Sequence, residues 1–168
     1  MSLSMYSISV PVFVRMLGNL SAVLDKAVAH AEAKKIDPQV LLDARLYPDM
    51  FPVTRQVQIA CDFAKGIAAR LAGQEPPKWE DTEKTFADLK ARIARTLDFL
   101  KHFAPSQIDG SEERVVKLTV RGEQIEVQGL PYLLYRGQPN FFFHVTTAYD
   151  ILRHNGVELG KSDFLGPL

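Results

Sequence analysis

Residues whose side chains could do chemistry gather in one stretch near the C-terminus, PNFFFHVTTAYDILRHNG, which runs from Pro139 to Gly156. Pro139 suits the first position of a helix, and Gly156 suits the residue that ends one. At about 100° per residue, His144 falls on the apolar side of this helix. We therefore expect its imidazole to face the core. It would be either a hydrogen-bonded structural histidine, or a metal ligand or general base in a pocket.

Other polar side chains lie close to His144 in the sequence. Tyr149 follows it on the same predicted helix, and His144 and Tyr149 are the catalytic candidates. A second group could line a ligand pocket near the start of the helix: Tyr132, Tyr135, Arg136, Asn140 and His144. The alternative is ordinary aromatic packing, in which the apolar rings are buried and the polar tips reach the surface.

The spacing of the histidines does not predict a metal site. Helical bundles bind metals through ligands on facing helices, or at i, i+3 or i, i+4 on one helix. His144 and His154 are ten residues apart, which corresponds to about 15 Å of axial rise. No other histidine, and no carboxylate, falls on a predicted apolar stripe. We therefore predict no cofactor, and His144 and Asn140 are the only candidates for holding a divalent metal.

Helical periodicity predicts three further long helices that must position these residues. They run from about Ser9 to Lys34, from about Pro52 to Ala72, and from Asp81 or Thr82 to near Phe103. Residues 74–81, QEPPKWED, contain two prolines and should form a linker. A short helical piece is expected after Asp37.

The periodicity changes to two after the third helix, which is typical of strands. The segments VVKLTV and EQIEVQ flank the turn pair Arg121-Gly122 and predict a β-hairpin. In this register, one face of the hairpin is almost entirely apolar: Val116, Leu118, Val120, Glu123, Ile125 and Val127. We expect this face to lie against the bundle.

Composition limits the classes of function. The 168 residues fit one domain spanning 1–168, with 46% hydrophobic and 24% charged residues. Twenty basic residues balance twenty acidic ones, and no basic run exceeds Lys34-Lys35, so binding to nucleic acid is not expected. The single cysteine, Cys61, has no partner for an internal disulfide. No segment predicts a membrane span, and a cytoplasmic location is expected.

The order of the four helices and the run NFFFHVTTAYDILRHNG resemble the DinB/YfiT-like helical bundles. The sequence is most similar to an uncharacterised bacterial branch whose members end in AY-x-x-LRHNG-x-x-x-GK-x-DF-x-G. The resemblance implies an all-α four-helix bundle with up-down-down-up topology and the β-hairpin inserted between the third and fourth helices. Eight linker residues reach about 27 Å when extended, which is enough to make the second and third helices parallel.

In the wider superfamily, several members bind a divalent metal through a histidine on the second helix and an HxxxH pair on the fourth, and some are thiol-dependent transferases. By this resemblance, the second histidine of the pair matches His144 and the first falls on Asn140. The second helix has no histidine between Pro52 and Gly73. The resemblance therefore implies a bundle that lacks two of the three metal ligands.

These observations predict a protein that binds an unknown small molecule or acts as a dimeric interaction protein. Homodimerisation is expected because the aromatic run from Phe141 to Phe143 offers more apolar surface than one core needs. The alternative is a transferase or hydrolase of the superfamily, dependent either on a metal or on His144 as a base.

Overall fold

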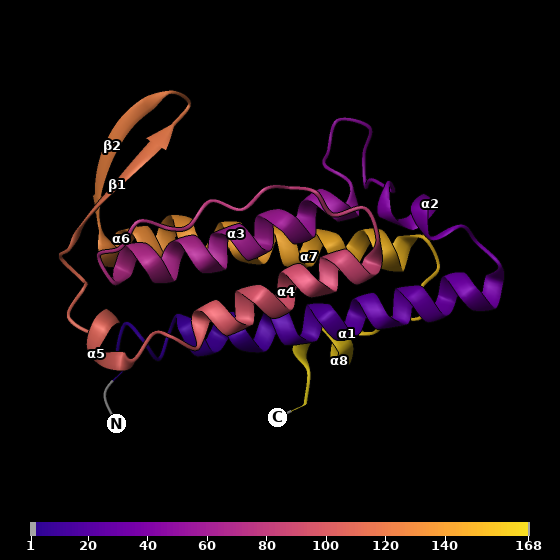
Figure 1. The fold of residues 1–168 in the computed structure, drawn as a ribbon, viewed down its shortest axis with the longest axis horizontal. Coiled ribbons are helices and arrows are strands. Elements are labelled where there is room, and N and C mark those ends of the chain that lie inside the picture. The colour runs from indigo at the N-terminus through magenta and orange to yellow at the C-terminus, as the bar shows by residue number, and fades with distance from the viewer. Residues whose placement is uncertain (1–2, 168) are drawn as a thin grey trace.

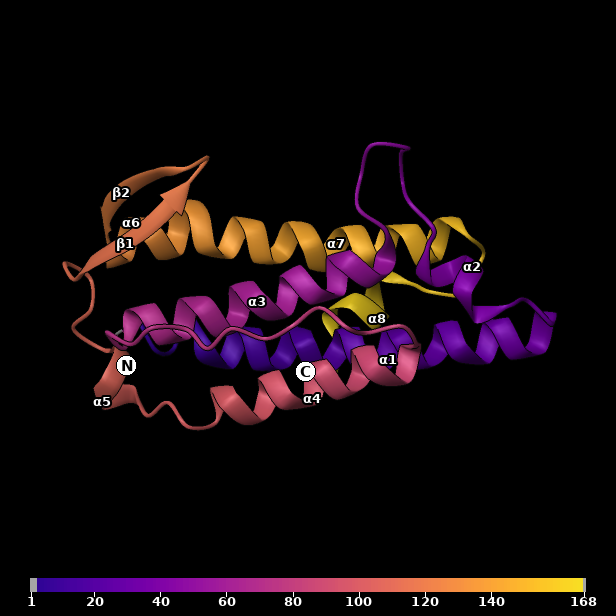
Figure 2. The ribbon, with the colours of Figure 1, turned by 45° about the horizontal axis from the view of Figure 1, so that its top comes forward.

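The computed structural model describes residues 3–167, and four long helices dominate it (Figure 1). They are α1 (Val10–Lys34), α3 (Val53–Leu71), α4 (Phe86–Leu100) and α7 (Gln138–His154). α1 and α7 run in one direction, and α3 and α4 run in the opposite one (Figures 1 and 2). The predicted up-down-down-up bundle is therefore confirmed.

Short elements connect and cover these helices. α8 packs against α1, where the Asn19 amide donates to the Phe164 carbonyl at 2.9 Å. The short elements, in chain order, are α2 (Pro38–Leu42), α5 (Pro105–Ile108), β1 (Val115–Val120), β2 (Glu123–Gln128), α6 (Gly129–Tyr132), the π-helical turn η1 (Leu133–Gly137) and α8 (Lys161–Leu165).

The hydrophobic core lies between the four long helices, and α3 is its central element because it packs against both α7 and α4. Small side chains, Ala60, Ala64 and Ala68, are fully buried on α3. Small residues let neighbouring helices approach closely. Larger fully buried side chains from α1 and α7, such as Phe13 and Phe141, fill the space between them, with ring centroids 4.9 Å apart.

The connection from α3 to α4, residues 73–85, is named the strap. Because α3 and α4 are parallel, the strap must return along the length of the bundle, and Figure 2 shows it doing so. The strap is longer than the predicted linker, since Thr85 and not Asp81 or Thr82 caps α4. The Thr85 hydroxyl accepts from the Asp88 amide at 3.1 Å, and the Asp88 carboxylate accepts from the Thr85 amide at 3.0 Å. This reciprocal capping box fixes the start of α4.

The β-hairpin has the predicted register, with Leu118 opposite Ile125 and Val120 opposite Glu123. The expectation that its apolar face lies against the bundle is confirmed only for the base of the hairpin, where Val116 is buried and Leu118 and Val127 are half-buried against the core. Nearer the turn, Ile125 is 37% exposed, and this part of the hairpin projects away from the helices (Figure 1). The physical reason is that α6 and η1, with Tyr132 and Leu133 buried, already cover that end of the bundle.

Helical structure before the last long helix begins earlier than predicted. α7 itself matches the predicted segment, but α6 and η1 already make the chain helical from Gly129 onward. In η1 the amide of Gln138 bonds back to the carbonyl of Leu133, five residues earlier. A proline ring normally clashes with the carbonyl four residues before it. We attribute the uninterrupted helical path to this wider turn, which directly precedes Pro139.

Within residues 3–167, no helix combines the length and the apolar character needed to cross a membrane.

Candidate functional site

His144 is half-buried at the edge of the interface between α3 and α7. Its Nδ1 lies 2.6 Å from Oε1 of Gln56, and Phe63 stacks on the ring with centroids 5.9 Å apart. The Gln56 amide nitrogen donates to the Phe51 carbonyl at 3.0 Å, so its Oε1 must accept from His144. Nδ1 therefore carries the proton, and Nε2 is the atom with the free lone pair.

The environment of His144 opposes its protonation. Burial, followed by the charge of Arg55, lowers the pKa of His144 to about 4. A general base works best when its pKa lies near the working pH. The imidazole is neutral at pH 7 and only weakly basic. It is therefore poorly suited to act as the general base of the transferase or hydrolase considered above.

The other predicted pocket residues, on the segment before α7, differ in burial. Tyr132 is buried, and its hydroxyl lies 3.4 Å from Nη1 of Arg70. Burial raises the pKa of Tyr132. Tyr135 is 80% exposed, whereas Arg136 is half-buried. The three side chains thus differ in their exposure to solvent.

Asn140 and Tyr149 also serve other contacts. The Asn140 amide donates to the carbonyl of Arg136 at 2.6 Å, within the same helical path. Tyr149 packs edge-to-face on Phe164, with centroids 5.8 Å apart, and so holds α8. Neither side chain is hydrogen-bonded to His144.

The residues at this site do not fit the divalent metal of the superfamily. Zinc sites in proteins use several nitrogen, sulfur or carboxylate ligands in a tetrahedral arrangement. Here one imidazole faces the side-chain amide of Gln56, and its Nδ1 is committed to that amide. Across residues 3–167, no group of three His, Cys, Asp or Glu side chains is placed to hold a metal ion.

A charged site that the sequence analysis missed lies between α3, α4 and the strap. At its centre is Arg92 of α4, whose side chain is only 2% exposed. Its Nη2 lies 3.0 Å from Asp62 on α3 and 2.9 Å from Asp81 on the strap. Its Nη1 donates to Glu83 at 3.0 Å and to the Glu80 carbonyl at 3.1 Å. One guanidinium thus fastens the strap to both helices.

Further cations balance the three carboxylates. Lys65 of α3 pairs with Asp62 at 2.8 Å, and Arg55 pairs with Asp81. Burial alone would lower the pKa of Arg92, but Glu83, Asp62 and Asp81 raise it above its ordinary value. The cluster of Arg92, Lys65, Arg55, Asp62, Asp81 and Glu83 is named the strap network. Its formal charges cancel.

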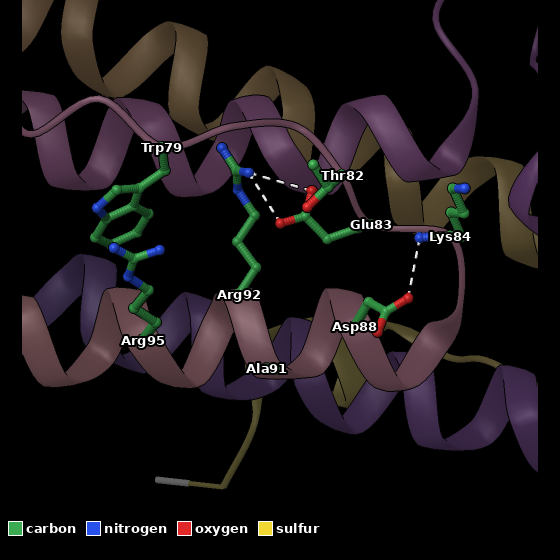
Figure 3. Close-up of a pocket in the computed structure, with 8 residues that line it drawn as sticks. All are labelled: Trp79, Thr82, Glu83, Lys84, Asp88, Ala91, Arg92 and Arg95. Carbon is green, nitrogen blue, oxygen red and sulfur yellow. Dashed lines mark hydrogen bonds and ion pairs between the residues drawn. The ribbon is translucent and has the colours of Figure 1, made fainter.

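Trp79 of the strap lies between two cations of this region. Lys65 Nζ and Arg95 Cζ are each 4.2 Å from the centroid of its ring. Cations attract the electron-rich faces of aromatic rings. These contacts hold the indole against both helices, and Figure 3 shows the Arg95 guanidinium against it.

Cavities lie on both sides of Trp79. The one in Figure 3 has a volume of about 320 Å³ and is lined by the strap and α4: Trp79, Thr82, Glu83, Lys84, Asp88, Ala91, Arg92 and Arg95. A second, of about 440 Å³, lies between the strap and α3 and shares Trp79. The strap therefore does not fill the groove in which it lies.

Cys61 lies close to this site but is not a reactive thiol. It is fully buried, and burial raises its pKa to about 12. Because the thiolate is the nucleophilic form, a thiol with this pKa is inert near neutral pH.

The sequence held a weak signal for Arg92. His144 is not the only ionisable residue of the helices that faces inward, because Arg92 and Lys65 are both only 4% exposed. Arg92 follows buried Leu89 by three positions, and residues at that spacing share a helix face. The linker before this helix carries Asp81 and Glu83, and acidic residues so near an inward-facing arginine could have indicated that they pair with it.

Replacing Arg92 with Met should strongly destabilise the protein, because it leaves three carboxylates facing a site without their main counter-charge. The loss should be about 1.5–3 kcal/mol, the range for hydrogen bonds to charged groups, and below that of a fully buried pair, because Asp62 and Asp81 are partly exposed and keep Lys65 and Arg55 as partners. Urea unfolding monitored by circular dichroism measures the loss. Arg92→Lys should fall between wild type and Arg92→Met, since an ammonium cannot replace the fork of donors. Arg95→Met, at an exposed position on the same helix, is the control, and a loss as large as that of Arg92→Met would contradict the assignment.

The protonation of His144 should be visible in an NMR titration of its ring C–H signals, with a midpoint near pH 4. An unfolded histidine titrates near 6.5. Between these values the unfolded chain binds a proton that the folded chain does not. The stability from the neutral ring is therefore complete above about pH 6.5 and is lost as the pH falls toward 4.

His144→Gln removes this titration, so its stability should fall less than that of the wild type between pH 7 and pH 4. Urea unfolding at both pH values gives the comparison. A wild-type midpoint at the unfolded value would show that the ring is not held in its neutral form.

Comparisons with known proteins agree with this fold. The model of DUF1993, a domain of unknown function, matches residues 5–165. A crystal structure of a DinB family member protein from Shewanella denitrificans is 45% identical, with a TM-score of 0.89, and the match covers 97% of this chain and 92% of that one. No protein with a curated description matches. This chain therefore belongs to the DUF1993 family and has the DinB-like fold.

Proposed function

We propose that this protein binds a small organic anion in the cavity beside Trp79. The observation that supports this is that the cavity wall carries cationic side chains without carboxylate partners, whereas its carboxylates are already hydrogen-bonded. Its carboxylates are occupied, since Glu83 accepts from Arg92 and Asp88 accepts from the start of α4. Lys84 and Arg95, which line the same cavity, have no carboxylate partner within residues 3–167.

The size of the cavity fits this proposal. A volume of about 320 Å³ is at the lower end of the range for small-molecule sites, which run from about 300 to 1,000 Å³. Free guanidinium and ammonium groups favour a carboxylate or a phosphate. The ligand class is therefore a small molecule with at least one such group.

The single tryptophan makes the proposal directly testable. Titration with citrate or inorganic phosphate, at an ionic strength held constant with sodium chloride, should change the fluorescence of Trp79 in a saturable way. Lys84→Gln should weaken the binding at least tenfold, as measured by calorimetry. Lys101→Gln is a matched control, because Lys101 pairs with Asp98 at the far end of α4. No saturable change with either anion, or equal losses in both variants, would overturn the proposal.

We also propose that two copies of the chain associate. The aromatic run that motivated this expectation contributes little, because Phe141 is fully buried and only Phe143, at 54% exposed, reaches the surface well. The hairpin and the turn that follows it supply a better reason. Four apolar side chains there are exposed: Val115 (55%), Ile125 (37%), Leu134 (38%) and Tyr135 (80%).

Light scattering of the purified protein should therefore give a mass of about two chains of 18.8 kDa each. A monomer mass at every concentration tested would overturn this part of the proposal.

A further inference from the structure

The hairpin offers a surface for a partner. β1 and β2 form a sheet of only two strands, so neither outer edge is paired with another strand of the described chain. The part of the hairpin near its turn also projects away from the helices (Figure 1). Unpaired backbone groups along an exposed edge readily pair with another chain.

The register determines which backbone groups of β1 point outward. The turn at Arg121 and Gly122 has φ values of 52° and 86°, as in the type I′ turns that close two-residue hairpins. Val120 and Glu123 flank this turn and therefore form a hydrogen-bonded pair. Along an antiparallel ladder such pairs alternate with pairs that are not hydrogen-bonded. The amides and carbonyls of Val115, Lys117 and Thr119 consequently point away from β2.

We propose that a second copy of this chain pairs its β1 with this edge, antiparallel, around a two-fold axis at Leu118. Leu118 then faces the partner's Leu118 in a pair that is not hydrogen-bonded. Lys117 faces the partner's Thr119 in a hydrogen-bonded pair, and Val116 faces the partner's Val120. This inference rests on the self-association proposed above and names the surface that carries it.

Charge selects this register over its neighbours. Moving the two-fold axis from Leu118 to Lys117 would place Lys117 opposite the partner's Lys117. Moving the axis to Thr119 would place Lys117 opposite the partner's Arg121. Like charges directly opposite each other destabilise a sheet. In the proposed register no like charges face each other, and the apolar residues Val116, Leu118 and Val120 of both copies form one continuous stripe.

The edge of β2 suits the pairing less well. Its outward groups belong to Gln124, Glu126 and Gln128, and one of its symmetric registers brings Glu126 against the partner's Glu126. A register that avoids this contact places Glu123 opposite the partner's Val127, on the apolar face. β1 has no such mismatch.

Charge complementarity at the base of β1 supports the same arrangement. Val115, Val116 and Lys117 line a cleft of about 210 Å³ whose other wall includes Glu75 of the strap. The proposed register places the partner's Arg121 opposite Val115, at the mouth of this cleft. Glu75 has no cation partner within residues 3–167, so the two opposite charges would meet there. Arg70, which also lines the cleft, is directed to the Tyr132 hydroxyl.

Disulfide trapping tests the register. Residues opposite each other in a pair that is not hydrogen-bonded have Cα atoms about 4.5 Å apart, a distance that a disulfide can bridge. Leu118→Cys should therefore give a covalent dimer on a non-reducing gel after mild oxidation. Gln124→Cys, on the other edge of the hairpin, should remain monomeric on the gel. The native Cys61 is fully buried and does not compete.

A pair of proline variants tests the edge without new thiols. Thr119→Pro removes an outward amide from β1, and Gln124→Pro removes an outward amide from β2, so both spare the hydrogen bonds within the hairpin. Thr119→Pro should raise the dimer dissociation constant at least tenfold, whereas Gln124→Pro should leave it unchanged. Circular dichroism confirms that both variants are folded.

The outcomes separate the two proposals. A dimer by light scattering that is not trapped through Leu118→Cys, or that is broken by Gln124→Pro instead, overturns the β1 edge and keeps the self-association. A monomer overturns both. The anion site is unaffected by either result.

Discussion

The ion pairs between Arg92 and the strap are the constraint on which this structure depends. Two consecutive helices that run parallel need a connection that travels the whole length of the bundle. Such a segment has no ladder of backbone hydrogen bonds to hold it, and here the side chains of Asp81 and Glu83 attach it to Arg92. Removing a guanidinium from water is costly, and only the surrounding carboxylates and the Glu80 carbonyl compensate for it.

The same arrangement explains where the cavities lie. A strap without regular secondary structure cannot fill the groove between two helices as a third helix would. It contacts the bundle firmly at Trp79 and at the strap network, and space remains between these contacts. The candidate binding site is thus a result of the topology. The His144 region lacks this feature, because α3 and α7 pack directly against each other there.

Much of the fold could be predicted from periodicity and from turn chemistry. The long helices, the hairpin register and the parallel pair α3 and α4 follow from local patterns and from the family resemblance. The strap network could not be predicted in the same way. A predicted core face is defined by its apolar residues, so a buried charged residue such as Arg92 is left out of it. A period of two likewise reveals that one hairpin face is apolar, but not which element covers it. For His144 the pattern gave the side of the helix but not the depth, which depends on Gln56 and Phe63 of another helix.

The π-helical turn before Pro139 has a consequence for aligning relatives of this chain. A bond that spans five residues accommodates one more residue than an α-helical turn does, without breaking the helix. Relatives with a regular helix here should therefore need a one-residue gap within 133–137. If the gap were placed after α7 instead, every position of α7 would be matched to the wrong neighbour, including the one occupied by His144.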